Sequence, residues 1–375
     1  MQMRKFGNTG EQISALGFGC MRFPEVENNG QWSVEQDKVD EMIRTAFENG
    51  VNYYDTAPYY CHSNSEKALG DALKGIRDQV LIATKCPVFD EGFKTSDYRR
   101  FLEQSLTRLG TDHIDFYHFW SLSGKGFDER VMGLGLLEEA VKAKEEGLIR
   151  HISFSFHDEP EQLRRIVETA GIMETVLLQY NLLDRRNEAM MAYAQGKGLG
   201  VVAMGPVGGG RLAAPGELYA KLTGKPATAT YEIALRFVLG NPHLSCALSG
   251  MTDRDIVLKN AAVAADETPM SAEEFQRINE AVAQLEKFKE LYCTGCGYCQ
   301  PCPQNIRIPD IFQLYTYSHV YGLHEYAKQA YSNHLQQGGV DPRTCLECGQ
   351  CEGKCPQKLS IIKELARVAD VLEGK

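Results

Sequence analysis

Eight cysteines in two regular groups constrain the fold of this chain most strongly. The groups span residues 293–302 and 345–355, and in both the first three cysteines stand three positions apart. A fourth cysteine follows in each group, with a proline directly after it. The full set is Cys293, Cys296, Cys299, Cys302, Cys345, Cys348, Cys351 and Cys355. Because no export signal precedes them, the cysteines indicate metal ligands rather than disulfides.

Two kinds of metal centre use cysteines separated by two residues. A zinc site needs only four ligands in two pairs, which leaves the third and fourth cysteines of each group without a reason for their spacing. Runs that end in Cys-Pro are typical of iron–sulfur proteins. The spacing therefore predicts two 4Fe-4S clusters rather than two zinc sites.

The cysteine spacing resembles that of two-cluster ferredoxins, in which the fourth cysteine of each run binds the other cluster. By this resemblance, one cluster is held by Cys293, Cys296, Cys299 and Cys355, and the other by Cys345, Cys348, Cys351 and Cys302. The 42 residues between the groups contain helical-looking stretches and exceed the spacing of compact bacterial ferredoxins. They resemble the α-helical ferredoxins that serve as electron-transfer modules. We expect a small, mostly α-helical domain over residues 291–375.

Residues 10–265 alternate between short apolar runs of β type and amphipathic helical stretches, which is typical of βαβ units. The candidate strands are residues 16–20, 52–56, 80–85, 114–119, 151–156, 175–180, 200–204 and 245–248. Eight repeats favour a closed barrel over an open sheet. The fold class is therefore α/β, a (β/α)8 TIM barrel over residues 1–268 that a bridging helix at 269–290 joins to the cluster domain.

Local signals mark several boundaries. Residues 3–6 and 12–15 flank a Gly-Asn-Thr-Gly turn, which predicts a hairpin at the barrel floor. Ser33 and Gln36 have the spacing of a capping box before a helix that ends near Asn49. Ser271 and Glu274 have the same spacing at the start of the bridging helix.

Charge and hydropathy exclude some functions. The 375 residues carry a net charge of -10 and contain no run of Lys and Arg that could neutralise a strand of phosphates, so we expect no nucleic acid partner. No stretch approaches 18 uncharged apolar residues and the start lacks the apolar segment of a signal peptide. We therefore expect no membrane partner and a cytoplasmic location.

Three polar residues stand where barrel enzymes place their chemistry, at the carboxyl ends of the second and third predicted strands. They are Asp55, Tyr60 and Lys85. A lysine near a tyrosine hydroxyl favours the phenolate and lowers a pKa that normally lies near 10, while an aspartate fixes the lysine. Tyrosine can then donate a proton near neutral pH, as hydride delivery to a carbonyl requires.

These residues resemble the aldo-keto reductase family, in particular its bacterial subgroup with a C-terminal 4Fe-4S dicluster domain. Further matching segments are residues 16–22, 50–60, 153–157, 179–181, 204–210 and 248–251. The resemblance implies catalytic roles for Asp55, Tyr60 and Lys85, and binding of NADP(H) or NAD(H). The implied cofactor-binding residues are Ser155, Gln179, Gly205, Gly208, Gly209, Arg211, Ser249, Gly250, Met251 and Asn260.

One position departs from the family. Its fourth catalytic residue is a histidine five positions after the aspartate of the fourth strand, and Trp120 occupies that place here. Tryptophan offers only an N–H donor, so proton relay there is lost. His118 lies two residues earlier, one layer deeper, and is expected to be a packed barrel residue.

Two functions remain open. The first is an iron–sulfur oxidoreductase that performs nicotinamide-dependent carbonyl or alcohol chemistry on a small-molecule substrate with Tyr60 as proton donor. Its electrons pass to or from the two clusters or a ferredoxin or flavoprotein partner. The second is a non-catalytic electron-transfer or docking subunit whose barrel site is degenerate at Trp120. Nicotinamide moves two electrons as hydride whereas each cluster takes one, so direct coupling needs a splitter such as flavin.

Overall fold

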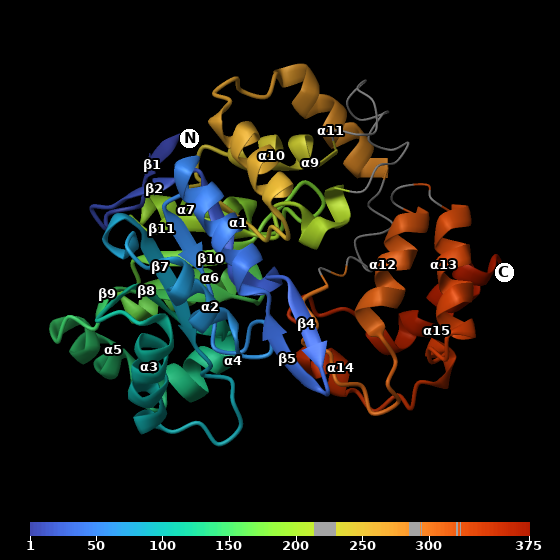
Figure 1. The fold of residues 1–375 in the computed structure, drawn as a ribbon, viewed down its shortest axis with the longest axis horizontal. Coiled ribbons are helices and arrows are strands. Elements are labelled where there is room, and N and C mark those ends of the chain that lie inside the picture. Colours follow the sequence, from blue (N-terminus) through green and yellow to red (C-terminus); the bar gives the residue numbers. More distant parts are fainter. Residues whose placement is uncertain (214–229, 285–292, 294, 320–321, 323) are drawn as a thin grey trace. The chain divides into compact units, whose positions relative to one another are not determined.

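The computed structural model describes residues 1–375 except 214–229, 285–292, 294, 320–321 and 323 (Figure 1). The chain forms two compact units. The first comprises Met1–Tyr180, Arg185–Pro206 and Val238–Thr268. The second comprises Asn181–Asp184, Val207–Phe237 and Pro269–Lys375.

Eight parallel strands form a closed barrel in the first unit (Figure 1). They are β3 (Leu16–Gly19), β6 (Tyr53–Asp55), β7 (Leu81–Cys86), β8 (Ile114–Leu122), β9 (Ile149–Phe156), β10 (Thr175–Gln179), β11 (Gly200–Met204) and β12 (Cys246–Ser249). Neighbours follow chain order, and β12 pairs with β3 to close the barrel. Nearly all strand residues are buried, as in parallel sheets covered on both faces. The predicted (β/α)8 fold is confirmed.

A hairpin of β1 (Met3–Lys5) and β2 (Gln12–Ser14) precedes the barrel, as predicted. Phe6 in its turn is fully buried, and its ring lies 4.8 Å from the Phe116 ring and 5.9 Å from the Tyr53 ring. A Cβ on Gly200, at the start of β11, would lie 2.2 Å from the Phe6 ring. A glycine there therefore lets Phe6 close the floor of the barrel.

Helices alternate with the strands. They are α1 (Gln36–Glu48), α2 (Ser65–Ala72), α3 (Thr95–Leu109), α4 (Gly124–Gly126), α5 (Leu136–Glu145), α6 (Pro160–Ala170), α7 (Glu188–Gly196), α9 (Thr230–Leu239) and α10 (Arg254–Ala265). Short 3-10 helices occur at η1 (Cys20–Arg22), η2 (Arg77–Gln79) and η4 (Gly208–Ala213), and η3 (Phe127–Met132) is a π-helix.

The capping box predicted before α1 is wrong. Ser33 lies in β5 (Gln31–Val34), which pairs with β4 (Glu25–Asn28) in a second hairpin. The N-cap of α1 is Glu35, and no side chain caps the helix there. The strand pairing outcompetes the capping signal because it engages the backbone of Ser33.

The second unit is mostly helical. Its elements include α11 (Ala272–Gln284), α12 (Ile308–His319), α13 (His324–Gln336), η7 (Pro342–Thr344), α14 (Gln350–Lys354) and α15 (Ile361–Glu373). The capping box of α11 is confirmed, since Ser271 N–H donates to Glu274 at 2.8 Å and Glu274 N–H donates to the Ser271 hydroxyl at 3.1 Å. The predicted continuation of this helix beyond Gln284 lies outside the described residues. Buried residues of α12, α13 and α15 form an apolar core together with Cys293 and Cys299.

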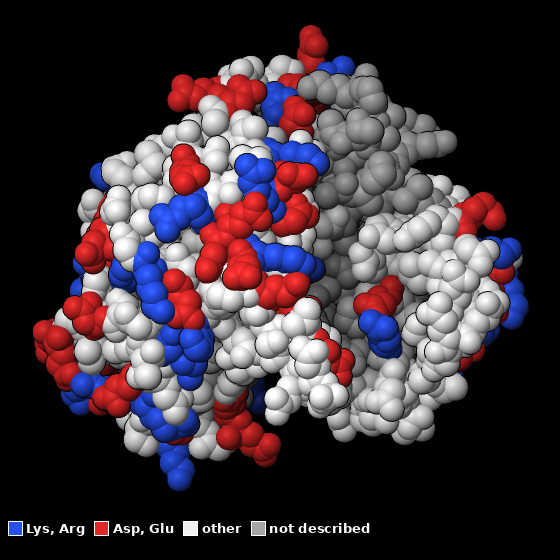
Figure 2. Space-filling view, viewed as in Figure 1, with Lys and Arg blue, Asp and Glu red and all other residues white. Residues whose placement is uncertain are grey.

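The surface shows no segregation of charge over the barrel unit on the face drawn in Figure 2, where blue and red side chains are intermixed. Among the described helices, none has both the length and the apolar content needed to cross a bilayer.

Candidate active site and cluster-binding loops

Asp55 and Lys85 form an ion pair inside the mouth of the barrel. Asp55 ends β6 and Lys85 lies near the end of β7, so the parallel strands bring both side chains to one edge. Lys85 Nζ donates to Asp55 Oδ1 at 2.5 Å and to the Thr56 carbonyl oxygen at 2.6 Å. Each residue is 1% exposed. Burial raises the pKa of Asp55, and the Lys85 cation opposes that rise.

Tyr60 and Trp120 complete the predicted set. Lys85 Nζ lies 4.6 Å from the centroid of the Tyr60 ring. The Trp120 ring meets the Tyr60 ring edge to face, with centroids 5.6 Å apart. Asp55, Tyr60, Lys85 and Trp120, which come from three different segments of the sequence, are therefore neighbours in the structure.

Aromatic rings surround Trp120. Its centroid lies 5.5 Å from that of Tyr59 and 5.2 Å from that of Phe89. Trp120 is 2% exposed, whereas Tyr59 and Phe89 are 43% and 46% exposed. We call Tyr59, Tyr60, Phe89 and Trp120 the aromatic wall. It gives the site an apolar side where the family has a proton-exchanging ring.

A β-bulge sets the position of Trp120. The register between β8 and β9 shifts between Phe119 and Leu122, and Ser121 has a left-handed backbone with φ of 53°. Bulges re-aim side chains and are common beside active sites. Ser121 N–H donates to the Ser155 hydroxyl at 2.7 Å. Ser155, for which the family resemblance implies a role in cofactor binding, thus holds the bulge in place.

His118 is fully buried, as expected for a packed barrel residue. Its Nε2 lies 3.7 Å from Asp55 Oδ2, a contact that the sequence analysis missed. His118 pairs in register with Lys85, and this pairing was the available signal. Burial and then the Lys85 cation lower the pKa of His118 well below its usual value, so the ring is neutral.

His157 follows β9 directly. Its N–H donates to the Leu122 carbonyl oxygen at 3.0 Å, which places it beside the end of β8. Burial and then the Lys85 cation lower the pKa of the His157 ring to about 4. This ring is also neutral near pH 7.

Seven of the ten expected cofactor residues lie in the first unit. Gln179 ends β10, and its Nε2 has no hydrogen-bond partner within the described part of the chain. A Cβ on Gly205, where φ is 66°, would lie 2.7 Å from that atom. Ser249 Oγ accepts from Asn260 Nδ2 at 2.9 Å. Gly250 and Met251 continue from β12, and a Cβ on Gly250 would lie 3.2 Å from Arg22 Cδ.

The other three cofactor candidates lie in the second unit. Gly208, Gly209 and Arg211 belong to η4, and both glycines have positive φ, at 55° and 66°. The side chain of Arg211 lies outside the described part of the chain. The expected cofactor set is therefore divided between the two units.

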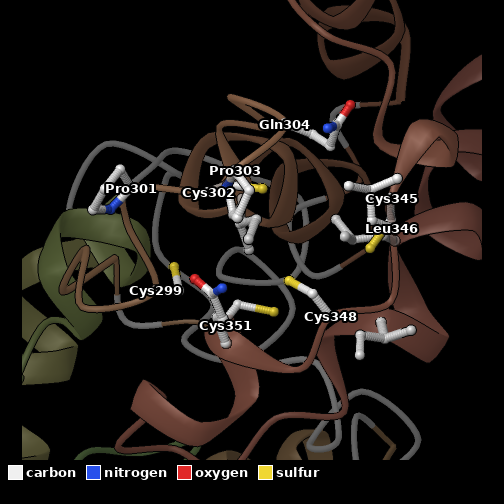
Figure 3. A pocket seen from close by; sticks show the side chains of 13 residues that line it. Cys299, Pro301, Cys302, Pro303, Gln304, Cys345, Leu346, Cys348 and Cys351 are labelled. Carbon is white, nitrogen blue, oxygen red and sulfur yellow. The ribbon is translucent and has the colours of Figure 1, made fainter.

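A small cavity lies between the two cysteine loops (Figure 3). Its lining includes Cys302 from the first group and Cys345, Cys348 and Cys351 from the second. Cys299 also lines it. The loops thus bring together the four cysteines expected to share one cluster, with Cys302 contributed from the other group.

The remaining cysteines gather around Cys299. Burial and then the proximity of Cys293, Cys296 and Cys355 together raise the pKa of the Cys299 thiol to about 12. Thiolates grouped in an apolar core need a cationic centre to hold them, which iron provides. Across the described ranges, which omit residue 294 and 285–292, no three His, Cys, Asp or Glu side chains are placed for a single metal ion.

The two cysteine loops share their backbone geometry. Gly295 N–H approaches Cys293 Sγ at 3.4 Å, and Glu347 N–H approaches Cys345 Sγ at 3.4 Å. Both donors have left-handed backbones, with φ of 72° for Gly295 and 54° for Glu347. Each loop directs a backbone amide at a cysteine sulfur.

Comparison with known families agrees with this architecture. The sequence pattern described as "Aldo/keto reductase family" matches residues 15–283, and that described as "4Fe-4S dicluster domain" matches residues 292–360. The chain belongs to the aldo/keto reductase family. It is an oxidoreductase with a C-terminal iron–sulfur domain, and the predicted recognition of both parts is confirmed.

Relatives of this aldo/keto reductase include L-galactose dehydrogenase of Arabidopsis thaliana, 29% identical over 78% of the chain and 96% of the relative. An uncharacterized oxidoreductase of Bacillus subtilis is 30% identical over 56% of the chain and 67% of the relative. Among solved structures, an aldo-keto reductase from Bacillus halodurans in its holo form has a TM-score of 0.64 at 27% identity, over 75% of the chain and 96% of that protein. An aldo/keto reductase from Klebsiella pneumoniae, solved with NADP and acetate, has a TM-score of 0.60 at 23% identity, over 74% and 94%.

Proposed function

We propose that the barrel interconverts carbonyl and alcohol groups of a small-molecule substrate with a nicotinamide cofactor, and that Tyr60 is the proton donor. The position of Lys85 carries this proposal, because the ammonium group contacts Asp55 and lies 4.6 Å from the Tyr60 ring centroid. A cation there stabilises the negative charge that Tyr60 acquires when it protonates a carbonyl oxygen. Asp55 fixes the lysine and balances its charge.

The residues of the first unit suit a nicotinamide cofactor. The buried Gln179 amide has an N–H without a partner among the described residues, and it can bind a polar group of the nicotinamide ring. Gly250, close to Arg22, lets an anionic group approach the backbone before α10. Bound nicotinamide supplies or accepts the hydride. The NADP present in the Klebsiella relative supports NADP(H), and NAD(H) is the other candidate.

Trp120 changes how protons move in the proposed reaction. Its indole N–H can orient a substrate oxygen but cannot accept a proton and return it. His118 and His157 are neutral, so neither supplies a competing positive charge at the site. We therefore assign the proton transfer to Tyr60 and an orienting role to Trp120.

We further propose that the second unit binds two 4Fe-4S clusters. The cavity supports one ligand set, namely Cys302, Cys345, Cys348 and Cys351. The mutual proximity of Cys293, Cys296, Cys299 and Cys355 supports the other. When bound, the clusters supply one-electron chemistry, whereas hydride carries two electrons. A ferredoxin or flavoprotein partner is proposed to exchange these electrons.

Anaerobic turnover of carbonyl and sugar substrates with NADPH and NADH tests the catalytic proposal. Tyr60→Phe removes the donated proton and is expected to lower kcat by about 100-fold or more. Tyr193→Phe is the matched control, because the Tyr193 hydroxyl donates to Glu168 on the surface. Full turnover by Tyr60→Phe rules out the proposed donor.

Cofactor binding and iron content test the rest. Cluster-loaded protein should bind NADPH or NADH and contain about eight iron and eight sulfide ions per chain. Failure to bind either nicotinamide favours the alternative of a non-catalytic electron-transfer subunit. Four irons, or zinc in their place, contradicts the two-cluster proposal.

A further inference from the structure

The second unit covers its two sets of cysteines to different extents. We call Cys293, Cys296, Cys299 and Cys355 the inner set, and Cys302, Cys345, Cys348 and Cys351 the outer set. Cys293 and Cys299 are each 8% exposed and belong to the apolar core of this unit. No member of the outer set is buried, and Cys348 is exposed. The outer set therefore lies nearer to solvent.

Leu346 lies beside the outer set and is exposed to solvent. Its side chain is 63% exposed, the highest fraction among the large apolar side chains of the described residues. The same residue lines the cavity between the cysteine loops, and Figure 3 shows it next to Cys345. An exposed apolar side chain therefore borders the cavity that the outer set lines.

Cys299 connects the two sets. It belongs to the inner set and is buried in the same apolar core as Cys293. It also lines the cavity of the outer set. A ligand of one cluster that borders the site of the other keeps the gap for electron transfer short, because tunnelling rates fall steeply with distance.

We propose that the outer cluster exchanges single electrons with an external one-electron carrier at Leu346, and that the inner cluster communicates with it through Cys299. This rests on the two-cluster part of the proposed function. In each exchange a reduced cluster passes from the 1+ to the 2+ state and the carrier gains one electron. No bond forms or breaks, and no proton is transferred.

We call the proposed site of electron exchange at Leu346 the port. Charged substitutions of Leu346 test it in the cluster-loaded protein. Leu346→Lys and Leu346→Asp are reduced with dithionite, freed of excess reductant, and mixed in a stopped-flow instrument with ferricyanide or with tris(phenanthroline)cobalt(III). The lysine variant should react about threefold faster with the anionic oxidant and slower with the cationic one, and the aspartate variant should show the reverse. The differences should vanish near 1 M salt, where the Debye length is about 3 Å.

Tyr326 gives a matched control for net charge. It is 58% exposed on α13 and packs against Tyr317, nine residues along α12 from the cavity-lining Ile308. That separation is about 14 Å at the helical rise per residue. Tyr326→Lys and Tyr326→Asp should therefore alter the rates little. Equal responses at positions 326 and 346 overturn the port.

Iron analysis and EPR distinguish a failure of the port from a failure of the two-cluster proposal. Variants with about eight irons and parental EPR signals but no charge response at position 346 overturn the port and leave the two-cluster proposal standing. About four irons in the parent protein overturns the two-cluster proposal itself. Glu347→Lys places the charge one residue away and replaces Leu346→Lys if that variant fails to fold, with the same expected sign.

Discussion

At the scale of single residues, substitutions in the buried pair of Asp55 and Lys85 should affect the stability of the fold and the catalytic activity differently. Lys85→Met leaves the Asp55 carboxyl buried without its cation, so the free energy of unfolding should fall by about 3–5 kcal/mol. Adding Asp55→Asn removes the remaining charge and should recover most of that loss. Neither variant should turn over substrate. Urea unfolding and anaerobic turnover measure the two effects.

The double variant tests both the role assigned to Lys85 and the cause of the stability loss. Turnover by Asp55→Asn combined with Lys85→Met contradicts the role assigned to the lysine beside Tyr60. Equal stability of the single and double variants contradicts the unpaired charge as the cause of the loss.

Sequence reasoning located the active-site candidates but not their supports. Asp55, Tyr60 and Lys85 stand at predicted strand ends, and the family resemblance, with its histidine five positions after an aspartate, pointed to Trp120. The bond from Ser121 N–H to Ser155 depends on a bulge that shifts the register of β8 and β9, and no local signal announced it. The approach of His118 to Asp55 depends on side-chain packing across the barrel, which spacing along one strand does not determine.

At the scale of elements, the two cysteine loops differ in one strained residue. Glu347 adopts a φ of 54°, where a side chain costs about 1 kcal/mol, while the equivalent Gly295 does so without that cost. Glu347→Gly should therefore stabilise the loop by about 0.5–1 kcal/mol. Slower loss of visible cluster absorbance in anaerobic guanidinium is the expected measurement.

Gly295 supplies the converse control. Gly295→Ala introduces a Cβ at a φ of 72° and should speed the loss of absorbance. If both substitutions act in the same direction, backbone conformation does not account for the difference between the loops.

Hydrophobic periodicity and capping residues predict most helices and strands, because these signals lie within a few residues of each element. All eight barrel strands and the capped start of α11 follow from runs of a few residues. The hairpin of β4 and β5 was missed, since Ser33 has a capping signal that its pairing with Val26 overrides. Strand pairing joins residues that are further apart in the sequence, and at Ser33 it prevails over the local capping signal.

At the scale of the whole molecule, acid should weaken the barrel before it protonates most carboxylates. The pKa of His157 is about 4 in the folded chain, below the unfolded value near 6.5. The unfolded chain therefore binds more protons between these values, and stability falls as pH drops from about 6.5 to 4. His118 contributes in the same direction.

Urea unfolding across this pH range, followed by tryptophan fluorescence, measures the effect in the barrel. The chain has two tryptophans, Trp32 and Trp120, and both lie in the first unit. His157→Gln should flatten the dependence above pH 4 while leaving the loss below it, where Glu174 with a pKa of about 2 takes up its proton. An unchanged slope in His157→Gln contradicts the assignment.

The residues that line the cavity between the cysteine loops are synthesised after the barrel strands. The last barrel strand ends at Ser249, the first cysteine of the cavity loops is Cys293, and the cavity needs Cys351 as well as Cys302. A ribosome therefore releases every strand of the barrel before the cavity can exist. Any group that this cavity binds can therefore enter only after every strand of the barrel has been made.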